Sequence, residues 1–140
     1  MATRTVLVLA PDASGAPGVP ALAPLEPVFV HPVDGPESAL AARLCAAITA
    51  HDPRPPLVIV VAGSLARVLP AIALAQRSSH RRVAEYVLLD PVLPPVTDGW
   101  PDAPVTVVVD DESADASVQG RLRGWTVLTS AAFAAWTPAD

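Results

Sequence analysis

The sequence predicts an open α/β fold of three layers, in which helices cover both faces of a mostly parallel sheet of about five or six strands. Its apolar runs, such as LVIVVA at 57–62, are continuous rather than alternating, which is typical of strands buried on both faces. Segments with helical spacing lie between several of these runs, as βαβ units require. At 140 residues, the chain is expected to form a single domain, 1–140, with its own core.

Six short runs rich in Val, Ile and Leu account for the expected strands. Their β-branched content and their Pro, Gly and Asp boundaries favour strands over helices. They are TVLVLA (5–10), PVFVH (27–31), LVIVVA (57–62), VAEYVLL (83–89), PVTVVV (104–109) and WTVL (125–128).

Two segments between these runs show the spacing of amphipathic helices. In 37–52, Leu40, Leu44, Ala47 and Ile48 recur with a period of about 3.6 residues, and Asp34 or Ser38 is expected to cap this helix. The second helix is expected over 65–79, where Pro70 should kink it or tighten its first turns. The remaining connections are expected to be irregular at 11–26 and 91–103, a loop with a short helix at 111–124, and a terminal helix or turn at 130–136.

Composition excludes several classes of function. The net charge is −5 without a dense run of Arg, which argues against a nucleic-acid or anionic-membrane surface. Cys45 is the single cysteine, so neither a disulfide framework nor a Cys/His zinc site is expected, and the absence of Lys excludes Schiff-base chemistry and a P-loop. No apolar run is long enough for a signal peptide or a membrane span. We therefore expect a cytoplasmic protein without a cofactor.

Polar residues follow each expected strand. Ligands of open parallel sheets bind outside the carboxyl ends of the strands, so these residues are the candidates for a site. They are Pro11-Asp12, His31, Gly63-Ser64, Asp90, Asp110-Asp111 and Thr129-Ser130. His51 and His80 end the expected helices and should lie at the opposite edge.

Ser64 has two interpretations. It can be the N-cap of the second helix. Alternatively, it is the nucleophile of a G-x-S-x-G elbow, in which a strained strand-to-helix turn exposes the serine hydroxyl. The stretch reads Ala62-Gly63-Ser64-Leu65-Ala66, with alanines in place of both motif glycines. The elbow interpretation predicts a positive φ at Ser64.

The phrases VIVVAGSLARVLPAIALA, VLLDP and APVTVVVDD, together with the order of strands, resemble the α/β-hydrolase family over about residues 5–130. The chain is similar to a shortened, cap-less member without the usual first strands. The resemblance implies that Ser64 is the nucleophile and that Asp110 or Asp111 is the catalytic acid, with Asp90 at an alternative acid position one strand earlier.

The resemblance also implies an oxyanion and substrate site. The backbone N–H of Leu65 matches one oxyanion donor and the loop at Asp12 and Ala13 matches the other, with Gly63 beside them. The chain departs from the family after its last strand, where it reads WTVLTSAAFAAW without the catalytic histidine. Because a serine hydroxyl needs a base to take its proton, generic esterase activity is expected to be weak or absent.

Other residues at this edge keep two interpretations. His31 is the only histidine expected there, either as a base or simply as the end of a strand before Pro32. Asp12, Asp34 and Asp90 adjoin Pro or Gly and can cap turns instead of reacting. The acidic stretch DDES at 110–113 could attract magnesium, but its spacing matches no recognised loop, so no metal site is expected.

Three functions follow from these observations. The first is a hydrolase that acts on an ester or thioester, either as a small-molecule substrate or as a carrier-bound acyl group. The second retains the carbonyl pocket but uses Asp90 or Asp110 as an acid or base without hydrolysis. The third is a non-catalytic relative that binds a small molecule or a partner protein, with GWPDAP (99–104) and AAFAAW (131–136) as contact surfaces. A homodimer that covers an exposed strand edge is a further expectation.

Overall fold

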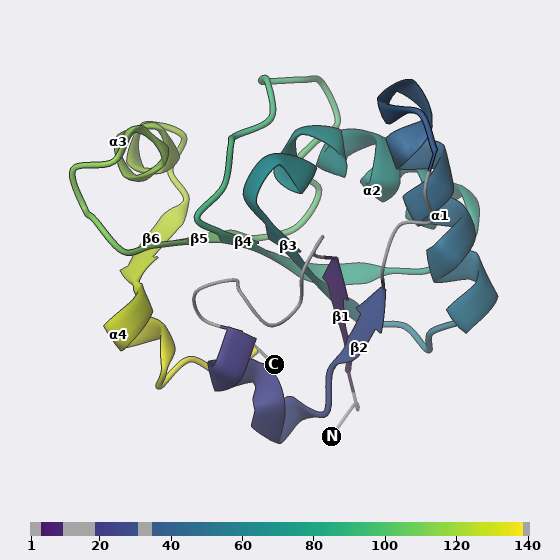
Figure 1. Ribbon diagram of the computed structural model, residues 1–140, viewed down its shortest axis with the longest axis horizontal. Helices are drawn as coiled ribbons and strands as arrows, with labels where there is room; N and C mark the ends of the chain where they lie inside the picture. Colours follow the sequence, from purple (N-terminus) through teal and green to yellow (C-terminus); the bar gives the residue numbers. More distant parts are fainter. Residues whose placement is uncertain (1–3, 10–18, 31–34, 139–140) are drawn as a thin grey trace.

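A parallel sheet of six strands forms the centre of the computed structural model, which describes residues 4–9, 19–30 and 35–138 (Figure 1). All five strand pairings are parallel, and the order across the sheet is β2-β1-β3-β4-β5-β6. The strands are β1 (Thr5–Leu9), β2 (Val28–Val30), β3 (Leu57–Ala62), β4 (Val83–Leu89), β5 (Val105–Val109) and β6 (Thr126–Thr129). The predicted open α/β fold is confirmed.

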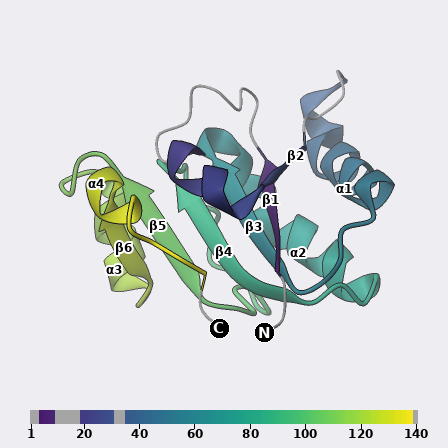
Figure 2. The ribbon, with the colours of Figure 1, turned by 90° about the horizontal axis from the view of Figure 1, so that it is seen from below.

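Helices cover both faces of this sheet (Figures 1 and 2). One face carries α1, α2 and α3, and the other carries η1 and α4. The α-helices are α1 (Leu40–His51), α2 (Leu69–Ser78), α3 (Asp115–Leu122) and α4 (Ser130–Phe133), and the 3-10 helices are η1 (Val19–Leu25), η2 (Glu37–Ala39) and η3 (Gly63–Val68). Both faces of strand β4 are apolar and have to be buried under helices. Tyr86 and Leu88 belong to the apolar cluster on one face of the sheet, and Val87 and Leu89 belong to the cluster on the other face.

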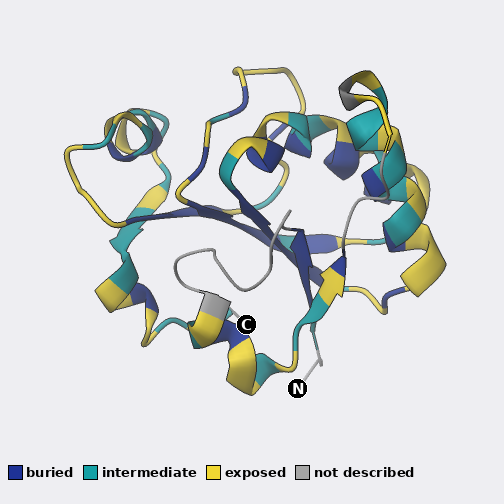
Figure 3. Ribbon diagram, viewed as in Figure 1, coloured by how far each residue is buried: buried dark blue, intermediate teal, exposed yellow. Residues whose placement is uncertain are grey.

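The central strands β1, β3, β4 and β5 are almost entirely buried (Figure 3). All six residues of β3 are buried, as are all five of β5. This burial explains why their sequences are continuous runs of Val, Ile and Leu, since neither face is in contact with water. The edge strand β2 is shorter than the expected strand and exposes Phe29.

Several helix starts differ from the sequence expectations. Segment 19–25, expected to be irregular, forms η1 and buries Leu22 against the sheet. The N-cap of α1 is Ala39 and makes no side-chain cap hydrogen bond, so the expected cap at Ser38 is wrong, and Asp34 lies outside the described residues. Pro70 lies in the first turn of α2, directly after the tightened turns of η3, as expected. Among the described residues, no helix combines the length and apolar character needed to cross a membrane.

The order of strands reverses between β1 and β3. β1 pairs with β2 on one side and β3 on the other, while β3 to β6 follow in chain order. Crevices for ligands form at such switch points, outside the carboxyl ends of the strands. On the β3 side of this point lies the turn at Gly63 and Ser64.

Candidate functional site

The turn after β3 differs in one decisive way from the predicted elbow. Gly63 has the positive φ, +59°, whereas Ser64 is not among the residues with positive φ. Ser64 is the second residue of η3, and its side chain is exposed without a hydrogen-bond partner among the described residues. The prediction of a strained elbow at Ser64 is therefore wrong, because the glycine immediately before it takes up the left-handed conformation at no steric cost.

Ser64 does not act as a conventional helix cap either. The residue at the N-cap position of η3 is Ala62, in extended conformation, and no side chain caps this helix. Leu65 and Ala66, which follow Ser64, are buried against the sheet. The turn thus reverses at Gly63 and anchors itself through Leu65, while Ser64 points to solvent.

The described residues leave space next to Gly63. Apart from its chain neighbours and the backbone of its own helix, a Cβ added there would meet none of their atoms within 4 Å. The carbonyl oxygen of Gly63 accepts a hydrogen bond from the backbone N–H of Val92 at 3.1 Å. This bond holds the loop after β4 beside the turn after β3, so residues from both strands share the carboxyl edge.

Asp90 lies at this edge, next to the turn, as the strand order predicted. Ala62 of β3 is paired with Leu89 of β4, which in turn is paired with Val108 of β5. The backbone of Asp90 has a positive φ of 43°, and its N–H donates to the carbonyl of Val108 at 2.7 Å. Aspartate tolerates this conformation better than most residues, but it is uncommon outside glycine and often marks functional positions. The Asp90 side chain is exposed and has no hydrogen-bond partner among the described residues.

Asp110 and Asp111 instead hold neighbouring turns together. Asp110 accepts a hydrogen bond from the Ser130 hydroxyl at the start of α4. Asp111 accepts bonds from the backbone N–H of Ser113 at 2.9 Å and from its hydroxyl at 2.7 Å. The bond from the Ser113 backbone, followed by that from its hydroxyl, lowers the pKa of the Asp111 carboxyl below its ordinary value. Asp111 thus bonds within its own turn, as turn aspartates do, whereas Asp110 links the end of β5 to the start of α4.

A groove of about 530 Å³ lies along the carboxyl edge between the loop after β4 and helix α3. Its polar side chains are Asp90, Asp115, Gln119 and Arg123, and the rest of its lining is Pro91, Val92, Leu93, Ala114 and Ala116. Arg123 is already engaged, since its Nη1 donates to the carbonyl of Pro94 at 2.8 Å and its guanidinium lies 5.0 Å from the centre of the Trp125 ring. The groove thus carries two exposed carboxylates, Asp90 and Asp115, against the single guanidinium of Arg123, which leaves it with a net negative charge.

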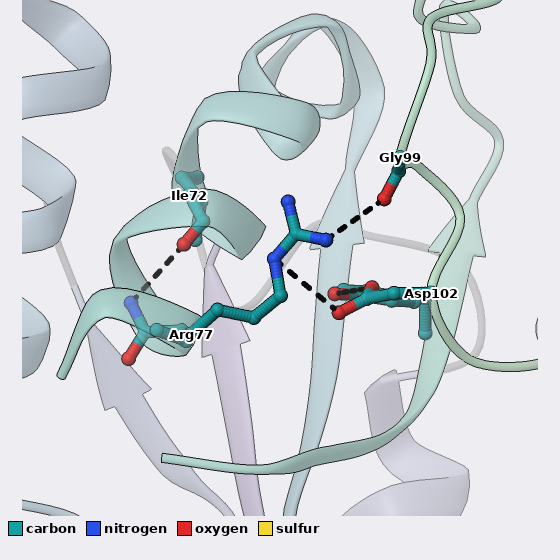
Figure 4. Close-up of polar contacts among 6 residues, drawn as sticks. Ile72, Arg77, Gly99 and Asp102 are labelled. Atoms are coloured by element: carbon teal, nitrogen blue, oxygen red, sulfur yellow. Dashed lines mark hydrogen bonds and ion pairs between the residues drawn. The ribbon is translucent and has the colours of Figure 1, made fainter. Parts of the chain in front are cut away.

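A second cleft, of about 390 Å³, lies at the amino edge of the sheet and is lined by Arg77, His80, Arg81, Arg82, Val83 and Asp102. In Figure 4, Arg77 reaches from α2 towards Gly99 and Asp102. Its Nη1 donates to the Gly99 carbonyl at 3.1 Å, and its Nε lies 3.9 Å from Asp102 Oδ2. Sequence reasoning missed this cleft, although the run from Arg77 to Arg82 contains three arginines and a histidine.

Not every predicted site residue can be placed. Asp12, Ala13 and His31 lie outside the described residues. His51 ends α1 and His80 follows α2, so both are at the edge opposite Ser64, as expected. In the described part of the chain, no three His, Cys, Asp or Glu side chains gather closely enough to hold a metal ion.

Comparison with known proteins adds information about the fold. No protein-family model and no curated protein matches the chain. A crystal structure of ESTFA in an Fe-lacking apo form matches it with a TM-score of 0.55 and 13% sequence identity. The match covers 91% of this chain but only 65% of that one, so this chain spans about two thirds of ESTFA's length. At 13% identity the likeness shows the fold alone, which is an open α/β fold.

Proposed function

We propose that this protein has a hydrolase-like fold and functions as a binding module. It holds a small organic molecule in the groove at its carboxyl edge and does not use Ser64 as a nucleophile. The position of the positive φ carries this proposal. A nucleophile elbow needs its reactive side chain on the residue with the positive φ, and here that residue is Gly63, which has no side chain.

The surroundings of Ser64 support the same conclusion. A serine becomes nucleophilic when a base accepts its proton through a direct hydrogen bond. Ser64 makes no such bond with any described residue, and the described histidines, His51 and His80, are at the far edge of the sheet. Asp110 and Asp111, which the family resemblance marks as acids, are engaged with other serines, Asp110 with Ser130 at the start of α4 and Asp111 with Ser113 of its own turn.

The chemistry of the groove suggests the kind of ligand. Asp90 and Asp115 contribute two exposed carboxylates, whereas the guanidinium of Arg123 is engaged with Pro94 and Trp125. Apolar side chains such as Val92 and Leu93 line the remaining surface. A small molecule with an apolar body and an amine or hydroxyl donor fits this combination, because carboxylates bind ammonium and O–H groups by charge-assisted hydrogen bonds. The described residues offer no donor set for an iron ion such as the Fe named for ESTFA, and the proposal includes none.

Fragment binding followed by two-dimensional NMR tests this proposal. A set of small primary amines, alcohols and carboxylates is titrated into the labelled protein. We expect amines and alcohols to shift amide signals in 90–93 and 114–123, and carboxylates not to. Asp90→Asn should weaken the amine fragments by about three- to tenfold, because it removes one charged partner.

The matched control is Asp98→Asn, which removes the same charge from an exposed residue outside the groove. It should leave fragment binding unchanged. Equal weakening by both variants, or shifts spread over the whole surface, would contradict a specific groove.

A second candidate, a non-hydrolytic enzyme with Asp90 as a base, is favoured by one observation. Asp90 combines a positive φ of 43° with an exposed carboxylate at the carboxyl edge. Strained residues of this kind are enriched at active sites. Solvent-deuterium exchange at the carbon next to the carbonyl of a ligand bound in the groove, lost in Asp90→Asn while the ligand still binds, would favour this candidate over simple binding.

A further inference from the structure

The cleft at the amino edge of the sheet concentrates positive charge in an acidic protein. Arg77, Arg81 and Arg82 face it, against one carboxylate from Asp102, although the chain carries a net charge of −5. The end of α2 contributes roughly half a negative charge from its last carbonyl groups. An excess of positive charge therefore remains in the cleft, and an anion that bound there would reduce the repulsion between these like charges.

Two of the three arginines are held in place by neighbours. The Nε of Arg81 donates to Gln76 Oε1 at 2.9 Å, and its Nη2 donates to Thr49 Oγ1 at 3.0 Å. Gln76 is itself fully buried and donates to the carbonyl of Ile72 at 3.3 Å, so Arg81 is anchored to α2 through a buried side chain. Because a guanidinium has five N–H donors, this anchoring leaves donors for a ligand.

Arg77 is oriented from the other side of the cleft. Its partner Asp102 accepts a hydrogen bond from the Tyr86 hydroxyl at 2.6 Å, and Tyr86 is fully buried between the sheet and α2. Asp102 is thereby fixed, and it fixes Arg77 in turn together with the Gly99 carbonyl. Preorganised cations lose less conformational freedom when they bind an anion, which favours affinity.

Arg82 differs from both. Its backbone carbonyl accepts a hydrogen bond from the N–H of Leu57 at 2.8 Å, so its Cα is fixed at the edge of the sheet. Its exposed side chain has no hydrogen-bond or ion-pair partner among the described residues. His80 adds a second exposed side chain, on a residue whose φ of +58° turns the chain sharply after α2. Both side chains can close over a ligand that the fixed arginines hold.

We propose that this cleft, lined by Arg77, His80, Arg81 and Arg82, binds a small molecule that carries phosphate groups. Its volume of about 390 Å³ lies within the range of small-molecule sites. Phosphate is favoured over a single carboxylate because it offers three acceptor oxygens and more negative charge to several guanidinium groups at once. The site is independent of the groove proposed above, because it lies at the opposite edge of the sheet.

Calorimetric titration with inorganic pyrophosphate tests the proposal. The buffer should have low ionic strength and no other multivalent anion, since salt screens exposed charges. We expect saturable binding at one site, and NMR shifts confined to 77–83 and the neighbourhood of Asp102. Arg82→Gln should weaken binding by about three- to tenfold, because one charge-assisted hydrogen bond is lost from a partly exposed site.

A matched control separates a site from general charge attraction. Arg121→Gln removes the same charge from an exposed residue of α3 that does not line the cleft. This variant should bind pyrophosphate within about twofold of the original protein. Absence of saturable binding, or equal weakening by Arg82→Gln and Arg121→Gln, would overturn the proposal.

Two further ligands identify the chemistry. Citrate carries similar charge on carboxylates, and affinity for citrate equal to or above that for pyrophosphate would overturn the assignment to phosphate. Adenosine diphosphate reports whether an organic group adds to binding. Tighter binding than pyrophosphate would support a phosphorylated metabolite, and equal binding would support a site that recognises the phosphates alone.

Discussion

Tyr86 provides a sharp test of the structure because it titrates almost alone. It is the single tyrosine of the chain, and the chain contains no lysine. Burial, followed by the hydrogen bond to Asp102 and the charge of that carboxylate, raises the pKa of the Tyr86 hydroxyl far above its ordinary value. In the alkaline range, the loss of its proton is therefore coupled to unfolding.

The sign and size of the effect follow from this shift. Above about pH 10, the ordinary pKa of tyrosine, the unfolded chain loses the Tyr86 proton while the folded protein keeps it. The unfolded state then binds fewer protons, so stability is fully present below this pH and falls as the pH rises, by about 1.4 kcal/mol per pH unit. At about pH 11 the free energy of unfolding should be about 1.4 kcal/mol lower than at neutral pH through Tyr86 alone.

Tyr86→Phe isolates this contribution. At neutral pH it should lower the free energy of unfolding by about 1.5 kcal/mol, the lower end for a hydrogen bond to a charged group. The lower end applies because the Asp102 side chain is 22% exposed and can be rehydrated. The phenylalanine variant does not titrate, so the difference between the two proteins should shrink almost to zero near about pH 11.

Urea unfolding followed by tryptophan fluorescence, at neutral pH and at about pH 11, measures the difference. Burial also raises the pKa of the Cys45 thiol, against a smaller opposing effect of Arg81, but Cys45 is common to both proteins and cancels. The ultraviolet absorbance of tyrosinate should stay absent from the folded protein at the higher pH. A difference that does not shrink, or tyrosinate that forms in the folded protein near about pH 10, would refute the buried Tyr86–Asp102 hydrogen bond.

Three other substitutions probe the turns around the carboxyl edge, each by denaturant unfolding. Gly63→Ala should lower the free energy of unfolding by about 1 kcal/mol, because alanine resists the positive φ although its Cβ has room; no loss would disprove the left-handed conformation. Thr129→Ala should lower the free energy of unfolding by about 0.5–2 kcal/mol, since the Thr129 hydroxyl caps α4 by accepting a hydrogen bond from the N–H of Ala132 at 3.1 Å. An unchanged denaturant midpoint of unfolding would argue against this cap. Because the pKa of Asp111 is lowered in the folded protein, its carboxylate contributes stability above its ordinary pKa, and this contribution is lost as the pH falls through its folded value. In Asp111→Ala, the free energy of unfolding should therefore decrease less steeply at acid pH. The same decrease in both proteins would exclude this contribution.

The positions of the strands and of the residues at their carboxyl ends could be predicted because burial leaves a direct mark in the sequence, whereas the order of strands was expected from the family resemblance. The bounds of β3 and β4 agree with the predicted runs 57–62 and 83–89, since each run ends in apolar residues directly before Gly63 or Asp90 begins a turn. Helix η1 was missed because a 3-10 helix lacks the 3.6-residue period, and Pro24 within it resembles a loop signal.

The turn after β3 shows where sequence patterns reach their limit. Small residues at 62, 63, 64 and 66 indicate a tight turn, but they do not indicate which of them has the positive φ. The resemblance to G-x-S-x-G favoured Ser64. The backbone decides in favour of Gly63, because glycine alone reaches positive φ without strain. The cleft at the amino edge was missed for a different reason, since it needs Asp102 and Gly99 to meet α2 across more than twenty residues of sequence.

The most direct test of the proposed binding function is ester turnover by the protein and its Ser64→Ala variant. Release of p-nitrophenol from p-nitrophenyl butyrate is measured for both, with His31→Ala as a third protein. We expect all three to show the same rate, close to that of buffer, because Gly63 rather than Ser64 has the positive φ and Ser64 has no base among its described neighbours. Robust turnover that Ser64→Ala abolishes would establish Ser64 as a nucleophile and contradict the proposal, and its loss in His31→Ala as well would identify the base.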